Sequence, residues 1–301
     1  MTGGNSGIGY QTALALARGG ASVLIACRNR KKADEAVRRL NAKVKGARVQ
    51  MVQLDLASPA SVRACADQVC SGAEPLDLLI NNAGIMAIPK RLATPMGFEM
   101  QFGVNHLGHF ALTGLLLPAL LKAKAPRVVS VSSIVHRTGT IDFDDLQSER
   151  GYAPWAAYSQ SKLANLLFAF EFQRKIDSAG TGLMSVAAHP GYSATNLQST
   201  GPNMNGPSLT AAILTFGNAV MAQSAAMGAL PILYAATAPD AKPGGFYGPG
   251  GPMELWGYPV PALPAVQATS LEAAARLWDV SEQLTGVKFE TGLRSSAPTL
   301  P

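Results

Sequence analysis

A glycine-rich turn at the start of the chain constrains its fold more than any other feature. Residues 2–9 read Thr-Gly-Gly-Asn-Ser-Gly-Ile-Gly and lead into a helical run at 10–18. Glycines allow a tight turn and a close backbone approach to a pyrophosphate, whose charge then lies at the helix N-terminus. In nucleotide-binding α/β folds such a turn follows a β-strand. Taken alone, it could equally be a generic Gly-rich turn.

Apolar runs alternate with helical stretches, which is the pattern of βαβ units and a parallel sheet. The runs are short and rich in β-branched residues or leucine, as suits strands buried on both faces. We predict an α/β fold, a Rossmann-type doubly wound parallel sheet with helices on both faces. We expect a single domain over residues 1–301, with a cofactor half to about 125 and a catalytic and substrate half from about 126. The predicted strands are 23–27, 49–55, 76–81, 127–132 and 183–188.

The strand expected before the glycine turn is missing, because only Met1 precedes Thr2. A Val codon, GTG, can be read as a starting Met, so we expect the true start upstream, with about 5–6 or more residues lost. Without them the backbone groups of both neighbouring strands lack partners, and the chain as given would fold poorly. Sequencing of the native N-terminus tests this expectation, and finding Met1 there would contradict it.

Composition points to a folded protein of a reducing compartment. Hydrophobic residues make up 48% and charged residues 15%, which argues against disorder. Cys27, Cys65 and Cys70 show neither metal spacing nor a paired framework, so we expect reduced thiols in a cytoplasmic protein. Signal-peptide features are not apparent.

The formal charge of +6 is concentrated in one segment. Residues 28–48 carry nine basic and two acidic side chains, and the remainder carries 16 basic against 17 acidic. No nucleic-acid motif or interleaved aromatic residues accompany this cluster, so we interpret it as a solvated helix face and expect no nucleic-acid partner.

The second half has a long segment without charges, residues 178–239. Glycine, proline and polar residues interrupt it, which disfavours a membrane span. We expect a buried lobe on the substrate side, with membrane contact peripheral at most. Apolar spacing predicts helices around 209–220, 224–236 and 269–284, and Pro and Gly predict a loop at 243–264.

Tyr158 and Lys162 lie four residues apart in a stretch with helical spacing, 154–177, so they share one face. An ammonium near a phenol favours the phenolate and lowers the tyrosine pKa from about 10. The tyrosine could then donate and accept protons near neutral pH. Such a pair is common by chance, so it needs support from other motifs.

That support is a resemblance to the short-chain dehydrogenase/reductases. Six motifs occur in the family's order, and two stretches, 105–110 and 158–165, look closest to the retinol-dehydrogenase-like branch. Protochlorophyllide reductases are more distant. The six motifs lie at residues 2–9, 81–84, 104–108, 131–133, 158–162 and 190–191.

The cofactor can be inferred from Arg28, nineteen residues after Gly9, with no acid beside it. At about this distance an acidic residue binds a ribose 2′-hydroxyl, whereas an arginine accommodates a 2′-phosphate. A guanidinium can hold the phosphate with two hydrogen bonds, and a carboxylate would repel it. We therefore favour NADP(H) over NAD(H).

The resemblance implies a catalytic set of Asn105, Ser133, Tyr158 and Lys162. Tyr158 would supply the proton, Lys162 would lower its pKa and bind the nicotinamide ribose, and Ser133 would hydrogen-bond the substrate oxygen. Asn105 would fix a helix and a water in a proton relay. Tyr158 and Lys162 would also bind the cofactor, together with Gly3, Asn5, Ser6, Gly7, Ile8, Gly9, Arg28, Asn29, Asp55, Leu56, Asn82, Ala83, Gly84, Pro190, Gly191 and Thr195.

Several of these assignments have structural alternatives. Asp55 could cap a helix, and Asn105 could be an ordinary buried amide. Ser132 competes with Ser133, but alternation along the strand should send it to the opposite face. The histidines lack a carboxylate or thiol at matching spacing, so we expect no metal.

We predict an oxidoreductase that transfers hydride between the nicotinamide and a hydrophobic aldehyde, ketone or alcohol. The alternatives are a carbon–carbon double-bond reductase, and a non-catalytic NADP-sensing or interaction module, or an inactive truncated chain. The resemblance also allows a homodimer, through the helices that carry Asn105 and Tyr158. Residues that could line the substrate pocket, or equally the core, are Met86, His136, Trp155, Tyr192 and Trp256.

Overall fold

The computed structural model describes residues 1–72, 74–193 and 222–289. Its strands form two hydrogen-bonded groups. In one group β1 (Ser22–Cys27) pairs in parallel with β2 (Arg48–Gln53). The other runs in spatial order β3 (Leu78–Asn81), β4 (Arg127–Val131), β5 (Met184–Ala188), β6 (Phe246–Pro249) and β7 (Pro259–Pro261), parallel except for β7.

The first three residues lie between these two groups. Thr2 forms a parallel bridge with Ala26 of β1 and donates its N–H to the carbonyl of Ile80 in β3 at 3.0 Å. The N–H of Ala26 donates to Met1 and the N–H of Gly3 donates to Ala26, both at 2.8 Å. We expected the backbone groups of the neighbouring strands to lack partners, because no full strand precedes the glycine turn. Residues 1–3 supply part of that pairing. They close the gap beside the glycine turn.

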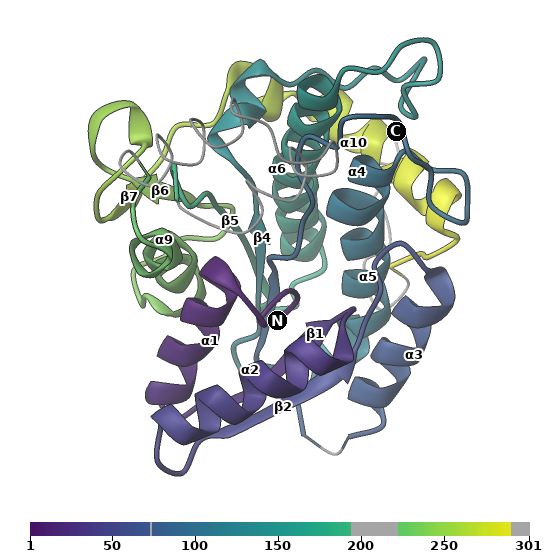
Figure 1. Cartoon of the computed structure of the whole chain (residues 1–301). Helices are drawn as coiled ribbons and strands as arrows, with labels where there is room; N and C mark the ends of the chain where they lie inside the picture. Colours follow the sequence, from purple (N-terminus) through teal and green to yellow (C-terminus); the bar gives the residue numbers. More distant parts are fainter. Residues whose placement is uncertain (73, 194–221, 290–301) are drawn as a thin grey trace.

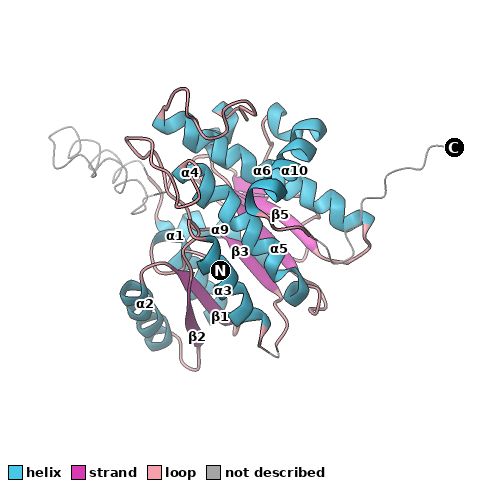
Figure 2. Ribbon diagram, turned by 90° about the vertical axis from the view of Figure 1, so that its right-hand side faces the viewer, coloured by secondary structure: helices cyan, strands magenta, loops and turns pink. Residues whose placement is uncertain are grey.

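Helices cover both faces of the sheet (Figures 1 and 2). The core on one face joins the sheet to α1 (Gly7–Arg18), α2 (Arg30–Lys43) and α9 (Ala225–Thr237). The core on the other face joins it to α3 (Pro59–Cys70), α5 (Gly108–Leu120) and α6 (Pro154–Ser178), with α10 (Leu271–Thr285) packed on α5 and α6. This is the doubly wound α/β architecture that the alternating pattern predicted.

Burial and capping explain why the predicted elements form where they do. In the middle strands, Val129 and Val186 are fully buried, as expected for strands covered on both faces. Burying a side chain of this size contributes about 1.5–3 kcal/mol. Ser58 caps α3 by accepting the N–H of Ser61, and Ser224 caps α9 by accepting the N–H of Met227.

The prediction of a loop over 243–264 was wrong, because this segment contains β6 and β7. Phe246 and Tyr247 pair with the end of β5, and β7 returns along β6. Proline is tolerated in edge strands, so the prolines of β7 do not prevent pairing. The helix expected around 209–220 lies outside the described residues. No described helix is long and apolar enough to cross a membrane.

Candidate active site

The glycine turn wraps the N-terminus of α1. Gly3 and Gly7 have φ angles of +68° and +53°, in the region that favours glycine. A Cβ on Gly9 would lie only 2.2 Å from the carbonyl oxygen of Gly3. Ser6, at the N-cap, makes no side-chain hydrogen bond to the helix. This cradle of glycine backbone at a helix N-terminus fits a pyrophosphate.

Thr2 holds the turn after β3 against the glycine turn. Its hydroxyl oxygen accepts the N–H groups of Asn82 and Ala83, both at 2.9 Å. The Asn82 side-chain amide donates to the Thr2 carbonyl at 2.9 Å. The predicted residues Asn82, Ala83 and Gly84 therefore lie beside the glycine turn, at the carboxyl end of β3.

Further predicted cofactor residues follow β1 and β2. Arg28 directly follows β1, and its side chain is exposed. Asn29 caps α2 by accepting the N–H of Lys32 at 3.0 Å. Asp55 accepts the N–H of Ala57 at 3.0 Å in a local turn before α3, whose N-cap is Ser58 and not Asp55. Leu56 is buried beside α5, where its carbonyl oxygen would lie 2.5 Å from a Cβ on Gly108.

Asn105 lies in a π-helical turn, η1 (Gly103–Leu107), between the short α4 (Met100–Phe102) and α5. π-turns are uncommon and occur frequently at functional sites. Its side-chain oxygen accepts the N–H of Ile85 at 2.8 Å, and its amide donates to the Ile85 carbonyl and the Ser161 hydroxyl, both at 2.9 Å. Asn105 thus ties η1 to the segment after Gly84 and to α6.

His109 connects Asn105 to the glycine turn. Its Nδ1 lies 2.9 Å from the Asn105 carbonyl oxygen, and its Nε2 lies 2.9 Å from the Thr2 hydroxyl. Because a carbonyl can only accept, Nδ1 must carry the proton and Nε2 must accept from Thr2. Burial lowers the pKa of His109 to about 4, so the ring stays neutral.

Ser133, Tyr158 and Lys162 meet at the carboxyl end of β4. The Ser133 side chain lies near the Tyr158 hydroxyl and lowers the pKa of the tyrosine by hydrogen bonding. Lys162 Nζ lies 5.7 Å from the centre of the Tyr158 ring and donates to the Val131 carbonyl at 3.2 Å. Three of the four predicted catalytic side chains are therefore neighbours, and the Lys162 ammonium lies 3.4 Å from where a Cβ on Gly84 would sit.

The expected lowering of the Tyr158 pKa is not observed. Burial raises the pKa of Tyr158 to about 12, against the opposing hydrogen bond from Ser133. Burial also lowers the pKa of Lys162 to about 8. Desolvation disfavours the charged form of each group, and it outweighs the attraction from which the expectation was argued. Tyr158 is thus a protonated donor at neutral pH.

The two serines after β4 face different neighbours. Ser132 is buried and donates to the Lys162 carbonyl at 2.7 Å. Ser133 precedes the short helix η2 (Ile134–Thr138) and is directed to Tyr158. Ser133 is therefore the serine available beside the tyrosine, in line with the alternation argument.

The segment after β5 carries the remaining predicted residues. Gly191 has a φ of +63°, and the Pro190 carbonyl accepts hydrogen bonds from Ser193 and Gln223, both at 2.8 Å. These bonds hold the segment at the carboxyl edge of the sheet. Thr195 lies outside the described residues.

Comparison with known proteins decides the family. The family model for short chain dehydrogenases matches residues 1–205. The chain belongs to the short chain dehydrogenases. Human retinol dehydrogenase 13 is 41% identical over 96% of this dehydrogenase and 84% of its own length. Mouse polyprenol dehydrogenase is 40% identical over 95% of this chain and 83% of its own length. Both place this enzyme in the retinol-dehydrogenase-like branch of the oxidoreductases.

Solved structures agree with the fold of this dehydrogenase. The crystal structure of an uncharacterized protein from Mycobacterium paratuberculosis has a TM-score of 0.78 and 44% identity, covering 96% of this chain and 92% of that one. The RhlG/NADP active-site complex from Pseudomonas aeruginosa has a TM-score of 0.61 and 26% identity, covering 81% and 91%.

The residues expected to line a substrate pocket of the dehydrogenase differ in exposure. Trp155 is 56% exposed, and its ring centre lies 6.1 Å from that of Tyr158. His136 is fully buried, with Nδ1 against the Ser133 carbonyl and Nε2 accepting the N–H of Ala265. Trp155 is therefore accessible to a substrate near Tyr158, whereas His136 braces the turn that carries Ser133.

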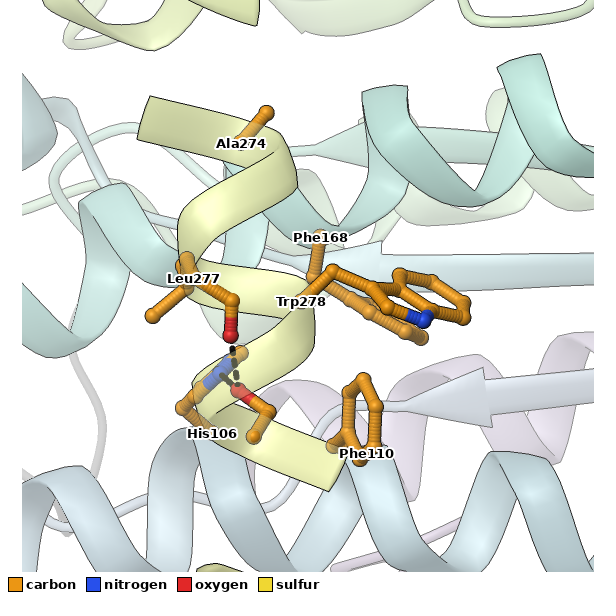
Figure 3. A pocket seen from close by; sticks show the side chains of 7 residues that line it. His106, Phe110, Phe168, Ala274, Leu277 and Trp278 are labelled. Atoms are coloured by element: carbon orange, nitrogen blue, oxygen red, sulfur yellow. Dashed lines mark hydrogen bonds between the residues drawn. The ribbon is translucent and has the colours of Figure 1, made fainter. Parts of the chain in front are cut away.

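A gap too narrow to hold a water molecule lies away from these residues of the dehydrogenase, between α5, α6 and α10 (Figure 3). Within it, His106 Nε2 lies 2.8 Å from the Ser281 hydroxyl. Aromatic and aliphatic side chains fill the rest, so this space belongs to helix packing. It is lined by His106, Phe110, Phe168, Ala274, Leu277, Trp278 and Ser281.

The sequence analysis did not identify some residues that make contacts around the site of the dehydrogenase. Thr2 and His109 stood inside motifs that were quoted, but one sequence does not reveal their contact. Glu254, whose carboxylate contacts Arg137 and His189, is the sole charged residue between Lys242 and Glu272, and this isolation is visible in the sequence. No cluster of metal-binding side chains occurs among the described residues.

Proposed function

We propose that this short chain dehydrogenase is an NADP(H)-dependent enzyme that transfers hydride between the nicotinamide and a hydrophobic aldehyde or ketone, or the corresponding alcohol. The observation that carries the proposal is the grouping of Ser133, Tyr158 and Lys162 at the carboxyl end of β4, with Lys162 Nζ 5.7 Å from the centre of the Tyr158 ring. When bound, the reduced cofactor supplies the hydride.

The chain's own residues would manage the proton and the developing charge. As negative charge grows on the carbonyl oxygen, Ser133 donates a hydrogen bond and Tyr158 donates its proton. Because the pKa of Tyr158 is about 12, its proton is present at neutral pH, which suits the reduction. Oxidation of an alcohol needs the phenolate instead, so its rate should rise with pH.

The preference for NADP(H) rests on Arg28. Its exposed guanidinium follows β1 at the position where a 2′-phosphate would be recognised. The glycine turn would hold the pyrophosphate, and Asn82, Ala83 and Gly84 would lie along the nucleoside. Other fold neighbours, such as the NADP complex above, are consistent with this cofactor class.

The hydrophobic substrate class is supported by the surface near the site. Six exposed large apolar side chains occur in the segment 253–271, in addition to Trp155. The curated relatives are named for retinol and polyprenol. We expect a cytoplasmic protein, with membrane contact that is peripheral at most. The six side chains are Met253, Tyr258, Val260, Leu263, Val266 and Leu271.

A homodimer through α5 and α6 would compete with α10. Trp278 of α10 is 4% exposed and packs against Phe110 and Phe168. The predicted homodimer would therefore have to use the parts of α5 and α6 that α10 does not cover. A mass above one chain by light scattering, lost on mutation of exposed α5 or α6 residues, would support it, and a single-chain mass would contradict it.

Replacement of Tyr158 by Phe tests the proposed chemistry. We expect turnover of long-chain aldehydes with NADPH to fall by about 10²–10⁴-fold, the contribution of a positioned acid. The NADPH dissociation constant should stay within about threefold. Tyr234→Phe is the matched control, because Tyr234 lies on α9 and donates its hydroxyl to Asp240, outside the site.

The result separates the alternatives. A non-catalytic NADP-binding module would show no turnover to lose. A carbon–carbon double-bond reductase would reduce an enone at the double bond and leave saturated aldehydes untouched. Equal turnover of small polar ketones, with no gain from longer chains, would contradict the hydrophobic substrate class.

A further inference from the structure

Glu254 lies in a long segment without other charges. No Asp, Glu, Lys or Arg occurs from residue 243 to 271 except this glutamate, which sits in the short helix η4 (Pro252–Glu254) between β6 and β7. A carboxylate in such apolar surroundings is stable only where other groups pair with it or hydrogen-bond to it.

The carboxylate bridges two basic side chains. Oε1 lies 2.7 Å from Nη2 of Arg137, and Oε2 lies 2.9 Å from Nε2 of His189. The His189 side chain is fully buried, and its Nδ1 accepts the N–H of Gly191 at 3.3 Å. Nδ1 is therefore unprotonated, so Nε2 carries the proton and donates it to Glu254.

The three residues come from separate elements, two of which carry candidate site residues. Arg137 lies in η2, the turn that begins at Ser133. His189 follows β5 and directly precedes Pro190 and Gly191, which are expected to meet the nicotinamide. Glu254 thus connects the serine side of the site to the cofactor side.

The backbone around Glu254 supports a positioning role. Met253 and Glu254 have φ angles of +53° and +57°, which non-glycine residues rarely adopt and which cluster where surrounding contacts hold them. The Leu255 carbonyl accepts the N–H of Tyr192 at 2.9 Å. A Cβ on Gly191 would lie 2.5 Å from the same oxygen. The η4 segment therefore packs closely against residues 191–192.

We infer that Glu254 is a positioning residue that joins the turn after Ser133 to the segment after β5 and so sets the distance between the Ser133 hydroxyl and the nicotinamide. The inference rests on the proposed function, because it assigns the two connected segments to substrate and cofactor. Loss of the bridge should misplace the reacting groups while leaving the glycine turn and Arg28 untouched.

The test compares Glu254→Ala and Glu254→Gln with the wild-type chain. We expect kcat to fall at least tenfold in the alanine variant and less in the glutamine variant, which can still accept one of the two hydrogen bonds. The NADPH dissociation constant should stay within about threefold. The isotope effect with deuterated NADPH should rise, because a misaligned hydride transfer becomes rate-limiting.

Glu149→Gln is the control, since Glu149 forms an exposed ion pair with Arg91 at 3.4 Å. It should leave kcat and the isotope effect unchanged. A lower melting temperature in Glu254→Ala with unchanged kcat and isotope effect would assign Glu254 to stability alone and overturn the inference.

Amide hydrogen exchange separates failure of this inference from failure of the proposed function. In Glu254→Ala, exchange should accelerate together in residues 133–139 and 189–193, and Glu149→Gln should change neither. If the wild-type chain turned over no carbonyl substrate, the proposed function would fail, and coupled exchange would still support the bridge. Unchanged exchange in both segments would refute the bridge whatever the activity.

Discussion

At the scale of single residues, Arg28 makes the cofactor preference testable. Arg28→Asp should lower kcat/KM with NADPH and change the NADPH-to-NADH preference by about 10- to 100-fold, because a charge-assisted contact to a phosphate is replaced by repulsion. Initial rates with each cofactor measure this. Arg38→Asp makes the same charge change on an exposed position of α2 and should not alter the preference. An unchanged ratio in Arg28→Asp would remove the argument for NADP(H).

Residue-scale prediction from the sequence succeeded where a short motif carries its own geometry. Tyr158 and Lys162 lie one turn apart on α6, so their proximity follows from helical spacing. The bridge from Glu254 to Arg137 and His189 spans more than sixty residues in either case. No local pattern encodes such a contact. The same limit applies to the shift of the Tyr158 pKa, since burial depends on the packing of the whole site.

At the scale of elements, the docking of α10 depends on a buried hydrogen bond. The Ser281 hydroxyl donates to the Leu277 carbonyl, so His106 Nε2 must donate its proton to Ser281. Ser281→Ala leaves that buried N–H without a partner and should lower the free energy of unfolding by about 1–3 kcal/mol. Urea unfolding measures the loss.

Ser178→Ala is the matched control for this variant. Its hydroxyl also donates to a carbonyl one turn back, that of Lys175, but at an exposed helix end. Its unfolding free energy should change by no more than about 0.5 kcal/mol. Equal values for the two variants would mean that the His106 contact contributes nothing to α10 docking.

The elements found from the sequence were those with strong periodicity or caps. β3, β4 and β5 are short apolar runs buried on both faces, and α3 and α9 begin at serine caps. β6 and β7 were missed because their Gly and Pro content is typical of loops, while their pairing depends on the neighbouring edge of β5. Edge strands carry little local signal when a preformed sheet supplies their partners.

At the scale of the whole molecule, histidine burial predicts acid sensitivity. The chain has four histidines, and burial lowers the pKa of each: His106 to about 3, His109 and His189 to about 4, and His136 below its usual value. Between about pH 4 and 6.5 the unfolded chain therefore binds more protons than the folded one. The free energy of unfolding must then rise with pH across this range and fall on acidification.

Each additional proton that the unfolded chain binds changes the free energy of unfolding by about 1.4 kcal/mol per pH unit. Chemical unfolding at pH 7, 6 and 5 should show a steadily falling midpoint, with proton uptake on unfolding. His106→Asn should reduce the slope by one proton, because asparagine does not titrate. A midpoint that stays constant from pH 7 to 5 would contradict this account.

The pairing at residues 1–3 has a consequence for the lifetime of the protein. β1, β2 and α2 are joined to the larger sheet through Met1, Thr2 and Gly3, so local opening should begin along this line. The glycine turn lies on one side of it and Asn82–Gly84 on the other. A dinucleotide in contact with both would hold the two groups of strands together and stabilise the folded state in proportion to RT ln(1 + [L]/Kd). Resistance to proteolysis should then increase with the concentration of a dinucleotide that binds across this line.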